Sequence, residues 1–153
     1  MEINPKLGGR IRAAFWSKTL LAVASVLSVL ILPFDFDWWS ALIVAGIWTV
    51  TFFEFRMYSY FLNGDPRAPD LGFCNQSCFA AAILMYGLYH AVYPTPIPEE
   101  IRGLLDETTL ELVQGLIKNA YLAIGILGGV SQFALAWYYR SAKAFPPVAD
   151  AGG

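Results

Sequence analysis

Two uncharged apolar runs in tandem constrain this chain more than any other feature of its sequence. The runs are Thr19–Phe34 and Trp38–Phe53, and the short turn Asp35-Phe36-Asp37 separates them. A helix that crosses the ~30 Å hydrocarbon layer needs about 20 largely apolar residues, so each run is long enough to form most of such a helix. The two runs therefore predict a helical hairpin inside a membrane.

The composition supports the same class of protein. Hydrophobic residues make up 57% of the 153 residues and charged residues only 14%, whereas an ordinary soluble domain carries about 25% charged residues. We therefore predict an all-α integral membrane protein with a single domain over residues 1–143. The proline- and glycine-containing tail, 144–153, is expected to be mobile.

Apolar runs, helix breakers and interfacial aromatic residues predict four transmembrane helices in a bundle. We place them at 14–34, 38–62, 72–93 and 118–140. Asn63-Gly64-Asp65-Pro66 ends the second span, and three closely spaced prolines follow the third. Between the third and fourth spans, acids alternate with leucines at helical spacing, which predicts an amphipathic helix over 98–115.

The distribution of lysine and arginine predicts the orientation. With both termini in the cytoplasm, the inner segments hold eight of the ten basic residues, and the outer segments hold only Arg102 and Lys118. We expect a multi-pass protein of a bacterial-type cytoplasmic membrane. The net charge of −2 provides no basic field for nucleic acid, which we exclude as a partner.

Lys18, Glu54 and Arg56 are the charged residues nearest to membrane depth. Counted from the turn at 35–37, Lys18 and Glu54 each lie about 24 Å down their helices, so we expect them to meet as a structural ion pair. An ionisable residue inside a membrane is also a candidate functional group. Glu54 is therefore a candidate proton or cation site, and Arg56 a candidate contact for an anionic headgroup or substrate.

His90 is the one histidine, and we predict it near the outer interface among tyrosines. It is a candidate to ligate a haem or chlorin or to hydrogen-bond a quinone, with ordinary interfacial hydrogen bonding as the alternative. Cys74 and Cys78 lie too far along the same helix to share a metal with it. We predict no metal site, and the sequence identifies no particular cofactor.

Small residues predict where helices approach closely. Gly125 and Gly129, with Gly128 between them, permit another helix to pack against the fourth span. Asn75 and Gln76, near the start of the third span, have side chains that can hydrogen-bond across helices.

No phosphate-binding glycine loop, nucleophile elbow or metal-binding helix motif is present in the sequence. We therefore expect no catalytic residues and predict a non-catalytic accessory subunit of a larger membrane complex, for example an energy-transducing one. Its expected partners are other membrane subunits, lipids and further copies of the chain. A small oligomeric transporter or channel, and a membrane redox protein that binds a quinone or cofactor, are the alternatives.

Overall fold

The computed structural model describes residues 5–31, 38–93 and 96–144, and within these ranges every regular element is a helix. The helices are α1 (Pro5–Ile31), α2 (Trp38–Leu62), α3 (Ala68–Val92), α4 (Glu99–Arg102), α5 (Glu107–Arg140) and the short 3-10 helix η2 (Ser141–Ala144). Four of them, α1, α2, α3 and α5, are long and apolar enough to cross a membrane, which suggests a multi-pass membrane protein. Apart from Ala144, the predicted mobile tail lies outside the described residues.

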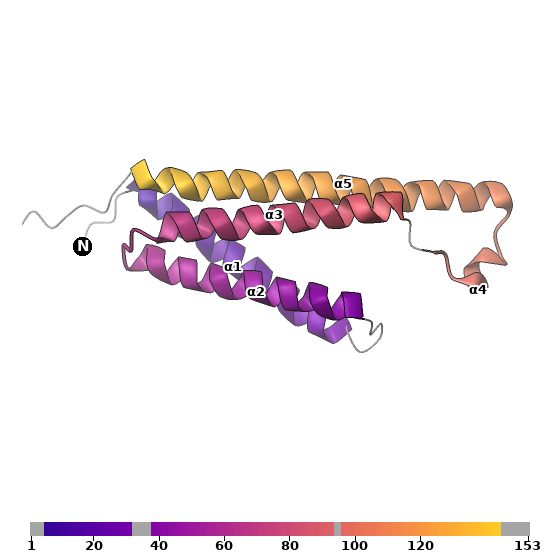
Figure 1. Ribbon diagram of the computed structural model, residues 1–153, viewed down its shortest axis with the longest axis horizontal. Helices are drawn as coiled ribbons and strands as arrows, with labels where there is room; N and C mark the ends of the chain where they lie inside the picture. Colours follow the sequence, from indigo (N-terminus) through magenta and orange to yellow (C-terminus); the bar gives the residue numbers. More distant parts are fainter. Residues whose placement is uncertain (1–4, 32–37, 94–95, 145–153) are drawn as a thin grey trace, which may run out of the picture. The chain divides into compact units, whose positions relative to one another are not determined.

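The chain divides into two compact units. The first contains residues 1–76 and 135–153, and the second contains residues 77–134. In the first unit, α1 and α2 pack along each other (Figure 1). The core of this unit is formed by Ala14, Met57, Phe61, Ala68, Tyr139 and Ala142.

In the second unit, the later part of α3 runs beside the earlier part of α5 (Figure 1). Gly87 and Gly125 meet there, because a Cβ atom added to Gly87 would lie 2.6 Å from the Gly125 Cα. Such close approach of two backbones is possible only where both residues lack a side chain.

The turn between α2 and α3 has the predicted chemistry. α2 ends at Leu62, as the sequence indicates, and Gly64 follows with a φ of 64°. The Asp65 amide donates to the Tyr60 carbonyl and the Gly64 amide to the Phe61 carbonyl, so the free carbonyl groups of the last helical turn are bonded. Glycine is favoured at the left-handed position of this motif because it has no Cβ atom.

Two helices begin before the membrane spans predicted within them, because polarity does not end a helix. α1 begins at Pro5 rather than at residue 14, and α3 begins at Ala68 rather than at residue 72. Proline is well suited to the first position of a helix, since its missing amide would have no partner there. Hydropathy marks the part of a helix that suits lipid, but the helix itself continues until a residue breaks it.

The largest correction concerns the predicted amphipathic helix 98–115. Only one turn of it forms separately, as α4, and residues 107–115 belong to the same continuous helix as the predicted fourth span. Asp106 begins that helix, because its Oδ1 accepts a hydrogen bond from the Thr109 amide at 2.8 Å. No proline follows until residue 146, so nothing divides α5 at residues 115–118.

Candidate functional site

A fully buried carboxyl group lies in the first unit. Glu54 of α2 has no solvent-accessible surface. Its Oε2 atom accepts hydrogen bonds from Asn75 Nδ2 at 2.9 Å and from Gln76 Nε2 at 2.7 Å, and its Oε1 atom accepts one from the Tyr139 hydroxyl at 3.1 Å. Side chains from α3 and α5 thus converge on one acidic group of α2.

A second layer of hydrogen bonds extends this cluster to α1. Asn75 Nδ2 also donates to the Val50 carbonyl at 3.1 Å, and Gln76 Nε2 donates to the Ser17 hydroxyl of α1 at 3.3 Å. The Gln76 Oε1 atom is buried and has no hydrogen-bond partner among the described residues. We call Glu54, Asn75, Gln76, Tyr139 and Ser17 the Glu54 cluster.

The short turn between α2 and α3 places the cluster at a common height. Glu54 lies eight residues before the end of α2, and Asn75 seven residues after the start of α3. At 1.5 Å per residue these positions are about 12 Å and about 11 Å from the turn. A tight hairpin therefore brings the acid and its amide donors level with each other.

The surroundings of the cluster are tightly packed. A Cβ atom added to Gly72 would overlap Met57 Sδ and would lie 2.8 Å from Tyr139 Cδ2. Asn75, Gln76 and Tyr139 all donate to Glu54, and an ionised carboxylate is a pure acceptor. The Glu54 cluster is therefore a polar contact that joins α2 to α3 and α5, and protein encloses its carboxyl group.

The predicted ion pair between Lys18 and Glu54 does not form. Lys18 Nζ instead lies 3.6 Å from the centre of the Tyr58 ring and within 5.2 Å of the Phe15 and Phe55 ring centres. The ion pairs among the described residues are Arg67–Asp65 and Lys143–Asp70. Residue counting sets the depth of a side chain along a helix, but not its direction around the helix axis.

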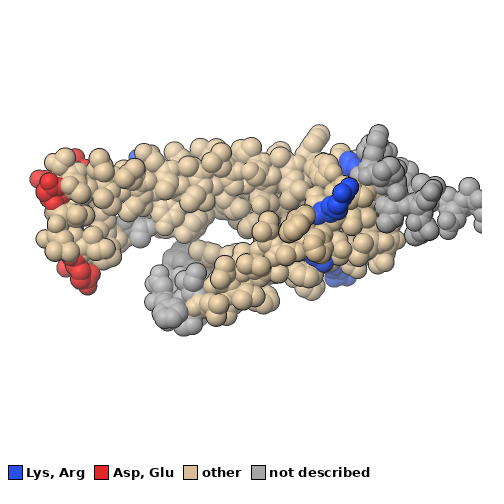
Figure 2. Space-filling model, turned by 180° about the vertical axis from the view of Figure 1, so that it is seen from behind, with Lys and Arg blue, Asp and Glu red and all other residues tan. Residues whose placement is uncertain are grey.

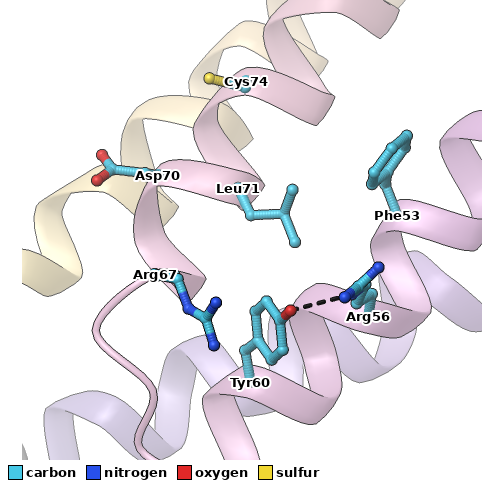
Figure 3. A pocket seen from close by; sticks show the side chains of 7 residues that line it. All are labelled: Phe53, Arg56, Tyr60, Arg67, Asp70, Leu71 and Cys74. Carbon is cyan, nitrogen blue, oxygen red and sulfur yellow. Dashed lines mark hydrogen bonds between the residues drawn. The ribbon is translucent and has the colours of Figure 1, made fainter.

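Arg56 lies on the exposed side of α2, away from the Glu54 cluster. Its Nε atom donates to the Tyr60 hydroxyl at 3.0 Å. Arg56 and Tyr60 line an open pocket of about 320 Å³ together with residues of α3 and of the turn before it (Figure 3). The remaining lining residues are Phe53, Arg67, Asp70, Leu71 and Cys74.

His90 is part of an aromatic cluster in the second unit. Its ring stacks on Tyr121 with centroids 4.5 Å apart, and the Tyr86 ring lies edge-on at the same distance. Tyr89 makes a third ring contact at 5.3 Å. Its predicted part in binding a haem or quinone stays a prediction.

The other predicted residues lie at separate places. Gly125 and Gly129 face α3, at Gly87 and Leu84 respectively. Cys74 and Cys78 are exposed, free thiols. Among the described residues, no group of three or more His, Cys, Asp and Glu side chains has the geometry of a metal site.

Tyr139 is one of two cluster residues that sequence reasoning missed, the other being Ser17. It belongs to the segment Trp137-Tyr138-Tyr139-Arg140, whose composition is typical of an interfacial anchor. Trp137 is 63% exposed, whereas Tyr139 is fully buried. The direction in which each side chain leaves the axis of α5 decides that Trp137 is exposed and that Tyr139 reaches Glu54.

Comparisons with protein-family models, with curated proteins and with solved structures found no match to this chain.

Proposed function

We propose that this chain is a non-catalytic accessory subunit of a larger membrane complex. In this proposal it lies in a bacterial-type cytoplasmic membrane with both termini inside, and its four long helices form one bundle. The observation that carries the proposal is the length of α5 together with the leucines that its first part exposes.

α5 is longer than a membrane is thick. Its 34 residues extend about 51 Å, against a hydrocarbon layer of ~30 Å. A tilt of more than 50° would be needed to contain it, and transmembrane helices tilt by up to about 40°. With Arg140 at the inner interface, residues 107–119 project from the outer face.

The projecting part exposes apolar side chains. Leu112 is 63% exposed and Leu116 is 62% exposed, and they lie one turn apart on the same side of the helix. Apolar side chains that gather on a surface in water favour contact with another protein. The occupant we propose is the extramembrane segment of a neighbouring membrane subunit, with apolar residues opposite the leucines.

The Glu54 cluster supports a structural role inside the chain. Its acid is enclosed by donors from α3 and α5, and the backbone at Gly72 packs closely against Met57 and Tyr139. A subunit of this kind would use its interior for holding helices together and its exterior for contacting partners.

The test is mild extraction from native membranes, purification through a tag after Gly153, and mass spectrometry with cross-linking. We expect a constant set of larger subunits, cross-linked near Lys118. The double change Leu112→Ser and Leu116→Ser should release them. Gln114→Ser, an exposed position on the opposite side of the same helix, is the matched control and should retain them.

Recovery of the chain alone, or only as its own oligomer, would contradict the proposal. It would also favour a small cation or proton transporter as the second candidate. The observation for that candidate is that Glu54 is buried without an ion-pair partner among the described residues, beside the unpartnered Gln76 Oε1. Proteoliposomes with an internal pH dye test it: an accessory subunit gives no flux above empty vesicles, whereas a transporter gives flux that Glu54→Gln abolishes.

A further inference from the structure

The pocket beside Arg56 is the part of the first unit whose chemistry fits a small anionic ligand. It lies between α2 and the start of α3, next to the turn at residues 63–67. Its volume of about 320 Å³ is at the lower end of the range for small-molecule sites. Arg56 lies six residues, or about 9 Å, from the end of α2, so its long side chain can reach the interface.

Two guanidinium groups flank one aromatic ring in this pocket. The Cζ atoms of Arg67 and Arg56 lie 5.0 Å and 5.7 Å from the centre of the Tyr60 ring, on opposite sides of it in Figure 3. Stacking on an aromatic face and the hydrogen bond from Arg56 Nε to the Tyr60 hydroxyl restrict where these groups point. The pair is therefore arranged before any ligand binds.

The two arginines differ in how much of their charge is already balanced. Arg67 is held by Asp65, with Nη2 2.8 Å from Oδ2, and the hydrogen bonds from Arg67 keep the pKa of Asp65 below its ordinary value. Arg56 has no carboxylate partner among the described residues. Its Nη1 and Nη2 groups are thus available as a fork for two oxygen atoms of a phosphate.

Asp70, the acidic residue that lines the pocket, does not neutralise the positive charge of Arg56. Asp70 is engaged by Lys143, with 2.6 Å between Oδ1 and Nζ, and its side chain points away from Arg56 and Tyr60 in Figure 3. Arg56, Arg67 and Lys143 against Asp65 and Asp70 give a net charge of +1. Phe53 and Leu71 add apolar side chains to the lining of the pocket.

We propose that this pocket binds the phosphate group of an anionic glycerophospholipid of the inner leaflet, with Arg56 as the principal contact. The glycerol and upper acyl carbons lie along Phe53 and Leu71, and Tyr60 and Arg67 border the headgroup. A basic pocket between transmembrane helices at the cytoplasmic side is a recognised form of lipid headgroup site. The site is independent of whether the chain has protein partners.

The test is native mass spectrometry of the full chain in detergent micelles with defined lipids. Phosphatidylglycerol and phosphatidylcholine with identical acyl chains are added separately, and their affinities compared. We expect preference for phosphatidylglycerol, reduced about fivefold by Arg56→Gln. Arg56→Lys should retain part of the preference, because the charge remains but the fork does not.

Arg102→Gln on α4 is the matched control, an exposed arginine of the other unit, and should leave the preference unchanged. Equal affinity for the two lipids, or equal effects of Arg56→Gln and Arg102→Gln, would overturn the proposal. So would displacement of phosphatidylglycerol by millimolar inorganic phosphate alone, since the pocket would then be a site for free phosphate. Circular dichroism checks that the exposed substitution leaves the fold intact.

Discussion

At the scale of single residues, Glu54 is the side chain that depends most on its surroundings, because its carboxyl group is fully buried. A buried carboxyl group is costly unless hydrogen bonds replace its water, and here three donors do so. The low polarity of the interior strengthens each of these bonds and makes the loss of any one more expensive. Glu54 thereby ties α2 to α3 and α5.

Tyr139→Phe removes one of these donors and keeps the ring. We expect the free energy of unfolding in detergent to fall by about 0.6–1.7 kcal/mol, the range measured for hydrogen bonds between membrane helices. Tyr138→Phe is the neighbouring control, because that side chain is exposed and packs against Arg10 through its ring. Equal stability of the Tyr139 and Tyr138 variants would show that the bond to Glu54 contributes nothing.

At the scale of elements, the contact between α3 and α5 depends on two glycines. The Gly87 Cα and Gly125 Cα atoms lie where a side chain on either helix would overlap the other backbone. The aromatic cluster of His90, Tyr86 and Tyr121 lies within one turn of this crossing. Close backbone approach and ring packing therefore reinforce each other along the second unit.

Gly87→Ala should force the helices apart. Its Cβ atom would lie 2.6 Å from the Gly125 Cα and 2.7 Å from the Tyr121 carbonyl oxygen, so we expect a loss of about 1–3 kcal/mol in thermal or denaturant unfolding. Gly115→Ala is the control on α5, where nothing lies within 4 Å of the added atom. That change should be neutral or stabilise by up to about 1 kcal/mol. A neutral Gly87→Ala would contradict the close crossing.

The start of α5 should depend on pH through Asp106. Hydrogen bonding from Thr109 lowers the pKa of Asp106 in the folded chain, so its stabilisation is complete above the unfolded pKa of about 3.9 and is lost as the pH falls through the folded pKa. Hydrogen exchange of the amides at 107–110, corrected for intrinsic rates, should show declining protection below about pH 4. Asp106→Asn retains the cap without titrating, and in that variant the pH dependence should disappear. If protection of these amides still declined below about pH 4 in Asp106→Asn, another titratable group would be responsible.

At the scale of the whole chain, charge is divided between the two units. The first unit holds eight of the ten lysines and arginines and seven of the twelve acids, a net charge of +1. The second holds two basic residues and five acids, a net charge of −3. On the face drawn in Figure 2, the basic side chains of the first unit gather toward one of its ends, and the acidic side chains of the second gather at the end that holds α4. The excess of basic residues in the first unit is the reason for the proposed orientation, with both termini in the cytoplasm.

Cysteine labelling in intact cells tests that orientation. In a background with Cys74→Ser and Cys78→Ser, Gln114→Cys should react with a membrane-impermeant maleimide added outside, because the proposed orientation places the start of α5 there and Gln114 lies on the side of the helix opposite the proposed partner contact. Asn63→Cys, in the turn after α2, should react only after the membrane is opened, and Leu127→Cys should stay unreactive within the lipid. The reverse pattern would invert the topology, and an unreactive Gln114→Cys would place the start of α5 inside the membrane.

The sequence by itself determined the helical class of the chain, its four apolar segments and the end of α2 at Leu62. These depend on local properties: the hydropathy of a segment, and the conformational preferences of Gly64 and Pro66. It also indicated Glu54, Arg56, Asn75 and Gln76 as unusual groups, because polar side chains within apolar runs are conspicuous. Each of these inferences needs only the residues along one stretch of chain.

Only the tertiary structure decided what those groups contact. The direction of a side chain around a helix axis depends on how neighbouring helices pack, and so it separated Lys18 from Glu54 and brought Tyr139 to the acid. The pocket beside Arg56 joins α2 to α3 and has no local signature. The continuity of α5 across 107–140 arises because a helix ends where its backbone hydrogen bonds are interrupted, and a change from polar to apolar composition does not interrupt them.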